Sequence, residues 1–285
     1  MNVGEFLRET TKAFDLVRPA VPTIPLVVDS PHSWRHYPEG FKPACREDDL
    51  LTSWDAWVDE LFGCTPTLGA PLLSARFPRF FIDPNRARDD IDSSLVDGTL
   101  PFSLNPTRKT EKGFGLLRRN ALPGIRVYDA PIPAKTLLAN IETYYDAYHA
   151  RLGALIEETQ RSFGRAIHLD CHSMKSRGNA MNDDPGAERP DIVVSDSFGT
   201  TADPSLSQRL ATEFSKVGLR TQINDPYKGA ELITRHSDPN QGRHSIQIEI
   251  NRALYMDEQT FTKSDNFQNV QNQIETVLKA LTQDM

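Results

Sequence analysis

The nine residues AIHLDCHSM (166–174) join a short apolar, strand-forming start to a polar end with two histidines, an aspartate and a cysteine. Successive side chains of a β-strand point to opposite faces, so a strand here places His168, Asp170 and His172 on one face and Cys171 on the other. In open α/β sheets, ligands bind beyond the carboxyl ends of the strands. The stretch therefore predicts a buried strand whose carboxyl end carries metal-binding or catalytic chemistry.

Outward from this strand, strand-like and helix-like patterns alternate along the chain, which predicts the α/β class. We expect one domain over residues 1–285, with a mixed, mostly parallel sheet flanked by helices. Asp203 and Pro204 are a typical N-cap and first-turn pair for one of the helices. Periodicity predicts strands over 24–30, 71–77, 124–129, 166–170, 191–195 and 244–251, and helices over 46–62, 135–161, about 204–217 and 264–282.

Two connections stand out by their length. The stretches 97–124 and 175–190 are long for loops of a compact domain, and such loops are more often functional or mobile than merely connecting.

The composition excludes several classes of function. The chain has 285 residues, a formal net charge of −7 and a pI near 5.5, so it lacks a broad cationic surface for nucleic acid. No run of about 18 apolar residues predicts a membrane span, and the start of the chain has no apolar signal segment. Three cysteines without a CxxC pair favour a reducing compartment. We therefore expect a cytoplasmic protein, whose basic spots such as Arg118–Arg119 suit small anionic substrates.

Ligand-type side chains recur at the ends of three expected strands. His32 follows the strand over 24–30, His172 ends the strand that begins at 166, and Glu249 lies on the polar face of the strand over 244–251. A pair of histidines at two strand ends favours a metal site. Catalytic zinc takes three protein ligands and leaves a fourth position for water.

The expected helix over 46–62 offers two carboxylates as the third ligand. At 100° per residue, Asp55 lies at the edge of the apolar stripe of this helix, and Asp59 lies further toward solvent. We expect Asp55 to be the ligand, with Asp59 as the alternative. Either residue is equally compatible with a solvated helix face.

Other interpretations of these residues need no metal. Cys171 as a nucleophile is disfavoured, because it faces away from both histidines and is well explained as a buried small hydrophobic residue. His32 alone is compatible with a loop histidine that satisfies local hydrogen bonds. A non-catalytic small-molecule-binding protein of the same fold is a further alternative, although Glu249 and the ligand-type residues are all present.

As a whole, the sequence resembles the N-formylglutamate amidohydrolase family over about residues 22–280. The resemblance implies a zinc-dependent hydrolase with a phosphorylase/hydrolase-like fold related to the zinc carboxypeptidases, and with one zinc or another divalent metal per chain. It rests on SPHS (30–33), WDAWVDELF (54–62), FIDPNRARDD (81–90), KGFGLLRR (112–119), HLDCHSM (168–174), RPDIVVSD (189–196), NDPYKGAELITR (224–235) and IQIEINRALYMDE (246–258).

The resemblance also implies an activity and a role for single residues. It implies hydrolysis of N-formyl-L-glutamate to formate and L-glutamate, the last step of a histidine-degradation route. The alternative is removal of another acyl group from an N-acyl amino acid or short peptide. His32, Asp55 and His172 are the implied metal ligands and Glu249 the implied general base. The implied substrate-binding residues are Asn85, Arg86, Arg252, Tyr255 and His244.

The sequence departs from the family pattern at two places. Trp34 follows SPHS where the family usually has glycine, and Ala230–Glu231 stand where it tends to keep a further glycine and an aromatic residue. Both departures concern the choice of acyl group or amino acid more than the metal chemistry. The oligomeric state stays open.

Overall fold

A computed structural model of the chain describes residues 5–178 and 184–283. Within these residues an eight-stranded sheet forms the centre of the molecule. Its strands, in spatial order, are β1 (Phe6–Thr10), β2 (Phe14–Pro19), β4 (Leu72–Ala75), β3 (Leu26–Ser30), β9 (Ala166–Met174), β12 (Arg243–Asn251), β10 (Ile192–Ser195) and β11 (Thr221–Ile223).

The sheet is mixed, as expected. β3 pairs in parallel with β4 and β9, β9 with β12, and β10 with β11. The other three pairings, β1–β2, β2–β4 and β10–β12, are antiparallel. The four parallel pairings bring the carboxyl ends of β3, β9 and β12 to one edge of the sheet.

The remaining elements are helices and short strand pairs. The helices are α1 (Glu47–Leu51), α2 (Val58–Leu61), α3 (Arg108–Glu111), α4 (Ala134–Asn140), α5 (Ala147–Phe163), α6 (Pro204–Lys216), α7 (Glu231–His236) and α8 (Phe267–Thr282). A π-helical segment, Ile141–Asp146, joins α4 to α5 without a break. The short pairs are β5 (Val96–Asp97) with β8 (Ile132–Pro133), β6 (Asn120–Leu122) with β7 (Ile125–Arg126), and β13 (Met256–Asp257) with β14 (Thr262–Lys263).

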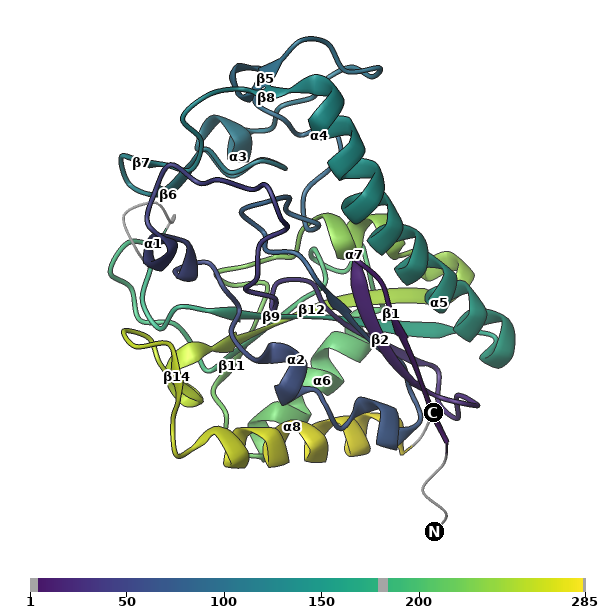
Figure 1. Ribbon diagram of the computed structural model, residues 1–285. Helices are drawn as coiled ribbons and strands as arrows, with labels where there is room; N and C mark the ends of the chain where they lie inside the picture. The colour runs from purple at the N-terminus through teal and green to yellow at the C-terminus, as the bar shows by residue number, and fades with distance from the viewer. Residues whose placement is uncertain (1–4, 179–183, 284–285) are drawn as a thin grey trace.

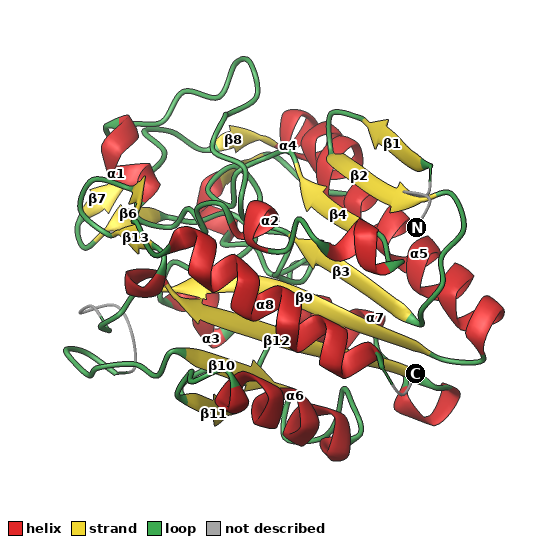
Figure 2. Cartoon of the chain, turned by 90° about the horizontal axis from the view of Figure 1, so that it is seen from below, coloured by secondary structure: helices red, strands yellow, loops and turns green. Residues whose placement is uncertain are grey.

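Helices cover both faces of the sheet, with α6 and α8 on one side and α4–α5 on the other (Figures 1 and 2). On the first face Leu169 and Cys171 of β9 pack with Phe214 of α6 and Ile274 of α8, all buried. Burying one such aliphatic side chain contributes roughly 1.5–3 kcal/mol. The expected alternation along β9 is confirmed, because its odd-numbered residues fill this apolar face.

The second face is apolar at its margin and polar at its centre. Leu152 of α5 packs there with Val27 of β3, and both are fully buried. Next to them the Tyr148 hydroxyl donates to Asp29 at 2.6 Å, and Asp29 also contacts His168 Nε2 at 2.9 Å. Buried polar groups need such partners to offset the loss of water. This polar centre continues along β9 to the end of the strand.

Two of the expected elements are wrong. The segment 124–129 forms only a two-residue strand in a hairpin, because Gly124 at φ 77° turns the chain just before it. The helix expected over 46–62 is interrupted between α1 and α2, where Trp57 has φ 54°, a value outside the right-handed helix. The other expected strands and helices are present with shifted ends, and β9 runs on to Met174.

Three further observations concern the chain ends and loops. The hairpin β1–β2 and the strand β11 were not predicted from the sequence. Of the long connection at 175–190, residues 179–183 lie outside the described part. In the described part no helix has the length and apolar character needed to cross a membrane.

Candidate active site

The ends of β3, β9 and β12 position the predicted site residues. Glu249 of β12 pairs in register with His172 of β9, and Asp29 of β3 pairs with Asp170 two residues earlier on β9. His32 follows β3 directly, in a turn that includes a contact between the hydroxyls of Ser30 and Ser33. The two histidines and Glu249 are therefore brought together by the sheet itself, as the sequence predicted.

Asp55 reaches the histidines from the break between α1 and α2. Its backbone N–H donates to the carbonyl of His32 at 3.2 Å, and the Trp54 indole donates to the carbonyl of Ser33 at 2.5 Å. In a continuous helix the Asp55 N–H would donate to the carbonyl four residues earlier. Docking onto the turn after β3 replaces that bond. Asp55 is thus at the site, but the helical geometry from which it was inferred is wrong.

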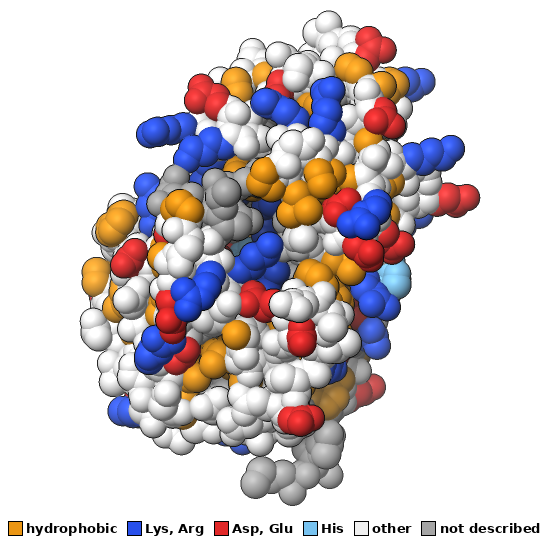
Figure 3. Space-filling model, turned by 90° about the vertical axis from the view of Figure 1, so that its left-hand side faces the viewer, with side chains coloured by type: hydrophobic (Ala, Val, Ile, Leu, Met, Phe, Trp, Pro, Cys, Tyr) orange, Lys and Arg blue, Asp and Glu red, His pale blue; other side chains and the backbone are white. Residues whose placement is uncertain are grey.

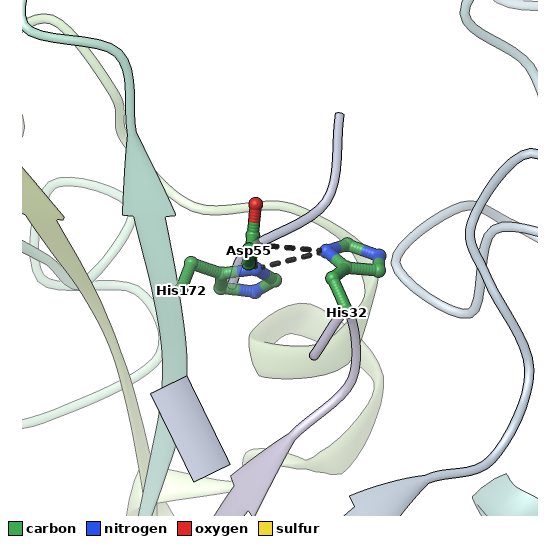
Figure 4. A group of neighbouring side chains, drawn as sticks. All are labelled: His32, Asp55 and His172. Atoms are coloured by element: carbon green, nitrogen blue, oxygen red, sulfur yellow. Dashed lines mark hydrogen bonds and ion pairs between the residues drawn. The ribbon is translucent and has the colours of Figure 1, made fainter. Parts of the chain in front are cut away.

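His32, Asp55 and His172 converge on one point (Figure 4). The two Nδ1 atoms are 3.0 Å apart, and Asp55 Oδ2 lies 3.1 Å from His172 Nδ1 and 3.4 Å from His32 Nδ1. All three side chains are buried, with at most 2% of each residue exposed. In the described part of the chain, this is the group of side chains with the spacing of metal ligands.

The opposite nitrogen of each imidazole faces a carboxylate. His32 Nε2 lies 2.8 Å from Asp83 Oδ1, and His172 Nε2 lies 2.8 Å from Asp170 Oδ1. A carboxylate only accepts, so a neutral His32 that donates to Asp83 carries its proton on Nε2 and presents a lone pair at Nδ1. The two Nδ1 atoms and one carboxylate oxygen face one another, which is an arrangement that suits a cation.

The spacing of these three atoms fits a tetrahedral metal. Zinc binds histidine nitrogen at about 2.0–2.1 Å and carboxylate oxygen at about 2.0–2.2 Å, which corresponds to about 3.3 Å between neighbouring ligands. The separations of 3.0, 3.1 and 3.4 Å bracket this value. Carboxylates behind metal-binding histidines are the usual way of fixing ring orientation. The residues present therefore suit a zinc-like ion.

The two carboxylates behind the histidines have different surroundings. Asp83 accepts from Arg79 at 3.0 Å and from Arg118 at 3.2 Å. Although burial opposes its charge, Arg79 and His32 outweigh burial and hold the Asp83 pKa well below its ordinary value. Neither oxygen of Asp170 receives a well-aligned hydrogen bond from the described residues, and burial raises its pKa. Asp170 is therefore the weaker of the two anchors.

Strong interactions shift the pKa values within the ligand group. Burial opposes the charge of Asp55, yet its contacts with His172 and His32 outweigh burial and hold the Asp55 pKa well below its ordinary value. Burial also opposes the charge of His172, but Asp170 and then Asp55 outweigh it and raise the His172 pKa well above its ordinary value. Burial, with the nearby charge of Arg79, lowers the pKa of His32.

Glu249 has the surroundings of a general base. Burial raises its pKa to about 7, and the negative charges of Asp55 and Asp170 add to the rise while His172 and Arg79 oppose it. Its Oε1 accepts from the Gln247 side chain at 3.0 Å. General bases work best when their pKa lies near the operating pH.

Asn85 lies at the site, but its side-chain amide already forms hydrogen bonds within the protein. Its Oδ1 accepts from the Leu232 backbone at 3.0 Å, and its Nδ2 lies 3.3 Å from Gln247 Oε1 and 3.1 Å from His172 Nε2. Only 4% of the residue is exposed. Asn85 therefore ties α7 to the ends of β9 and β12, and its contacts give no support to a direct role in holding a substrate carboxylate.

Arg252 is likewise engaged within the protein. Its guanidinium donates to Asp55 Oδ1 at 2.8 Å, to Ser173 Oγ at 3.0 Å and to the Thr52 carbonyl at 3.0 Å. The residue is 4% exposed. Tyr255, completely buried in the apolar core, lines no open surface either. The expected substrate roles of both residues are not supported by these contacts.

The remaining expected residues are distributed as follows. His244 pairs in register with Ile167 at the start of β9, and its Nδ1 accepts from the backbone of Asp203, so it lies at the far end of the strands from the site. Asp59 is not part of the ligand group. Cys171 is fully buried on the opposite face of β9, as predicted.

Several residues of the site were not predicted to act there. Asp83 precedes Asn85 in the DPNR stretch, which was itself a signal, whereas Arg79 lies in a stretch without any recognisable pattern. Arg79 contacts Asp83 and also lies 4.0 Å from Asp55. The contact with Asp83 is local, but Arg79 and Asp55 are far apart in the chain, and their contact leaves no trace in local sequence.

The structure and sequence match known proteins over most of their length. The family model for N-formylglutamate amidohydrolase matches residues 24–256. N-formylglutamate deformylase of Pseudomonas aeruginosa is 27% identical over 240 residues, 83% of this chain and 84% of that protein. The protein of the same name from Pseudomonas putida is 26% identical over 269 residues, 90% of this chain and 92% of that protein.

Two solved structures have the same fold. The crystal structure of N-formylglutamate amidohydrolase from Ralstonia eutropha JMP134 superposes with a TM-score of 0.89 at 36% identity, covering 95% of this chain and 96% of that one. A protein from Agrobacterium tumefaciens superposes with a TM-score of 0.66 at 18% identity, covering 95% of each chain, and at this identity it supports the fold alone. With the family model spanning most of the chain and these matches beside it, this protein belongs to the N-formylglutamate amidohydrolase family.

Proposed function

We propose that this protein is a metal-dependent amidohydrolase that converts N-formyl-L-glutamate to formate and L-glutamate within one catalytic domain. The observation that carries the proposal is the convergence of two imidazole Nδ1 atoms and the Asp55 carboxylate beside Glu249, in a chain of this family. The relatives named N-formylglutamate deformylase support the choice of substrate. That the reaction ends a histidine-degradation route stays a prediction from the resemblance.

His32, Asp55 and His172 would hold the metal. A bound zinc-type ion supplies a Lewis acid for the scissile carbonyl and lowers the pKa of a water molecule from 15.7 to about 7. The protein's own groups orient this chemistry. Asp83 keeps His32 in the tautomer that presents Nδ1, and Asp170 lies behind Nε2 of His172, so carboxylates back both histidines.

Glu249 is the group placed to move protons in this proposal. Its carboxylate accepts a proton from the attacking water and passes it to the nitrogen of the leaving glutamate. A pKa near 7 allows both steps at neutral pH. Such acid–base work contributes roughly 10²–10⁴-fold to the rate.

Trp34 is the bulky residue beside the expected metal ligands. Together with Trp54 and Phe80 it lines a recess next to His32. Trp34 is also held in place by the guanidinium of Arg76, 4.8 Å from its ring. In our proposal the bulk of Trp34 favours the small formyl group over a larger acyl group. The alternative, a deacylase for other N-acyl amino acids, becomes the better proposal only if larger acyl groups are accepted.

Formate release from N-formyl-L-glutamate by metal-analysed protein tests the proposal. We expect turnover that a chelator abolishes and zinc restores, and slower turnover of N-acetyl-L-glutamate. The substitution Trp34→Gly widens the recess. It should reduce the difference in turnover between N-formyl-L-glutamate and N-acetyl-L-glutamate. Turnover that survives complete metal removal would contradict the metal-dependent mechanism. It would favour the alternative in which a cysteine thiol is the nucleophile.

Glu249→Gln separates a catalyst from a binding protein. The variant keeps the shape of the side chain but cannot accept a proton, so turnover should fall by at least about 10²-fold. Its metal content should stay equal to that of the wild type, because Glu249 is not among the three converging ligands. Unchanged turnover would remove Glu249 from the mechanism.

A further inference from the structure

A group of cations lies beside the ligand group, around the buried carboxylate of Asp83. Arg79 and Arg118 form ion pairs with Asp83. The charges of Arg86 and Lys109 are close enough to Asp83 to interact with it as well. Lysine and arginine side chains gather around a hollow on one face of the molecule (Figure 3). This local excess of positive charge contrasts with the net charge of −7 of the chain.

Arg86 is a largely buried guanidinium without an ion pair among the described residues. Its Nε donates to the Phe114 carbonyl at 2.7 Å and its Nη1 to the Asn85 carbonyl at 2.6 Å, and both acceptors are neutral. The charges of Asp83, Asp90 and Glu249 act on Arg86 only at a distance and offset its burial in part. Arg86 is therefore free to form a direct ion pair with an anionic ligand.

Lys109 of α3 is held next to Arg86 by the backbone. Its carbonyl accepts from the Phe114 N–H at 2.8 Å, and the carbonyl of the same Phe114 accepts from Arg86. Thr107 anchors the start of α3 by donating from its backbone to Asp90 at 2.7 Å. The Lys109 side chain is exposed, and within residues 5–178 and 184–283 its amine has neither a hydrogen bond nor an ion pair.

The family resemblance already implies that Arg86 binds the substrate. We propose that Lys109 is the second cation of this subsite: Lys109 binds the side-chain carboxylate and so selects glutamate-type ligands, while Arg86 holds the α-carboxylate. This inference rests on the proposed function for the identity of the ligand. In this proposal Lys109 takes the carboxylate-binding role that the sequence suggested for Arg252. The guanidinium of Arg252 already donates to Asp55, Ser173 and Thr52.

The charges around Lys109 support this role. The positive charge of Arg86 is the main cause that lowers the Lys109 pKa to about 8, and Arg79 and Arg118 add to the repulsion. Burial and Arg79 likewise lower the Arg118 pKa to about 9. A ligand with two carboxylates would relieve the repulsion between these cations. An amide in place of the side-chain carboxylate would not, and this difference is the source of the selectivity.

Calorimetric titration with L-glutamate and L-glutamine tests the subsite without requiring turnover. The proteins to compare are the metal-loaded wild type, Lys109→Gln, Lys109→Arg and the control Arg108→Gln, which removes an exposed charge from the same helix. We expect the wild type to bind L-glutamate about 10–100-fold more tightly than L-glutamine, as one charge-assisted hydrogen bond allows. Lys109→Gln should lose most of this preference, whereas Lys109→Arg and Arg108→Gln should keep it.

The outcomes separate the subsite from the proposed function. If Lys109→Gln keeps the wild-type preference, if Arg108→Gln loses it equally, or if the wild type has none, the subsite is wrong. Formate release is measured independently on the same preparations. A wild type that shows the expected binding pattern but releases no formate leaves the subsite standing and refutes the proposed reaction. Formate release together with an unchanged preference for L-glutamate in Lys109→Gln supports the proposed reaction and refutes the subsite.

Discussion

Replacing Arg252 by glutamine distinguishes two roles for this residue. The sequence alone suggested that Arg252 holds a substrate carboxylate, whereas in the structure it donates to Asp55 Oδ1 at 2.8 Å. The other oxygen of Asp55 faces the two histidines. Arg252 therefore fixes the orientation of Asp55 and, in our proposal, acts on the metal through it.

The size of the effect follows from the contacts that are lost. The bond to Asp55 joins two charged, buried groups, and hydrogen bonds to charged groups contribute about 1.5–3 kcal/mol. If the loss falls on metal binding, it corresponds to a weakening of about 10–100-fold, since 1.4 kcal/mol is a factor of ten. The bonds to Ser173 and Thr52 join Arg252 to neutral groups and contribute mainly to stability.

The assay is a zinc titration of metal-free protein against a competing chelator, followed by steady-state kinetics at saturating zinc. We expect a weaker zinc affinity in Arg252→Gln, with the KM for N-formyl-L-glutamate close to that of the wild type. The zinc affinity of Arg252→Lys should lie between those of the wild type and Arg252→Gln, because one ammonium cannot replace the planar guanidinium with its several donors. A thermal melt monitored by circular dichroism confirms that each variant is folded. Unchanged zinc affinity with a raised KM would refute our reasoning and restore Arg252 as a substrate residue.

Three further predictions follow from the surroundings of single side chains. Asp170→Asn should weaken zinc binding about 10–100-fold, because the amide no longer holds His172 as a carboxylate does; a titration showing equal affinity would contradict this. Asp59→Asn should keep zinc binding, unlike Asp55→Asn. The same Asp59→Asn variant should be more stable to unfolding than the wild type at pH 7. Burial raises the Asp59 pKa to about 6, so the wild type loses stability as the pH rises from 4 to about 6. Denaturant titrations across this pH range would show or exclude the loss. L-glutamate binding should weaken as the pH rises through the Lys109 pKa of about 8, by up to about tenfold per unit, whereas Lys109→Arg should bind evenly from pH 7 to 9.

The strands and their chemistry were predictable because the information is local. Along β9 the alternation of apolar and polar residues decides which side chains share a face, so His168 and His172 were placed on the opposite face from Cys171. Parallel pairing then brings the strand ends to one edge. The catalytic side of the sheet follows from this pattern without any tertiary information.

The helix over 46–62 could not be predicted correctly, because tertiary contacts override its periodicity. Leu50, Trp54 and Leu61 have helical spacing and are indeed buried, but in separate segments. The Trp54 indole and the Asp55 backbone bind the turn after β3 instead of continuing the helix. Those hydrogen bonds join residues about twenty positions apart, and local sequence gives no sign of them. Asp55 was chosen from both the helix spacing and the family motif, and its position beside the histidines depends on the turn contacts rather than on the helix.

The two Asn-Arg pairs of the site show what sequence alone cannot distinguish. Asn85-Arg86 and Asn251-Arg252 have the same residues in the same order, and both lie next to the ligand group. Arg86 has two neutral acceptors and no carboxylate partner among the described residues, whereas Arg252 is paired with Asp55. A paired arginine acts on the site through the carboxylate that it binds, and an unpaired one is available to an anionic ligand. The same change to glutamine should therefore weaken metal binding at Arg252 and L-glutamate binding at Arg86, and the reverse pattern would show that pairing in the free protein does not determine the role.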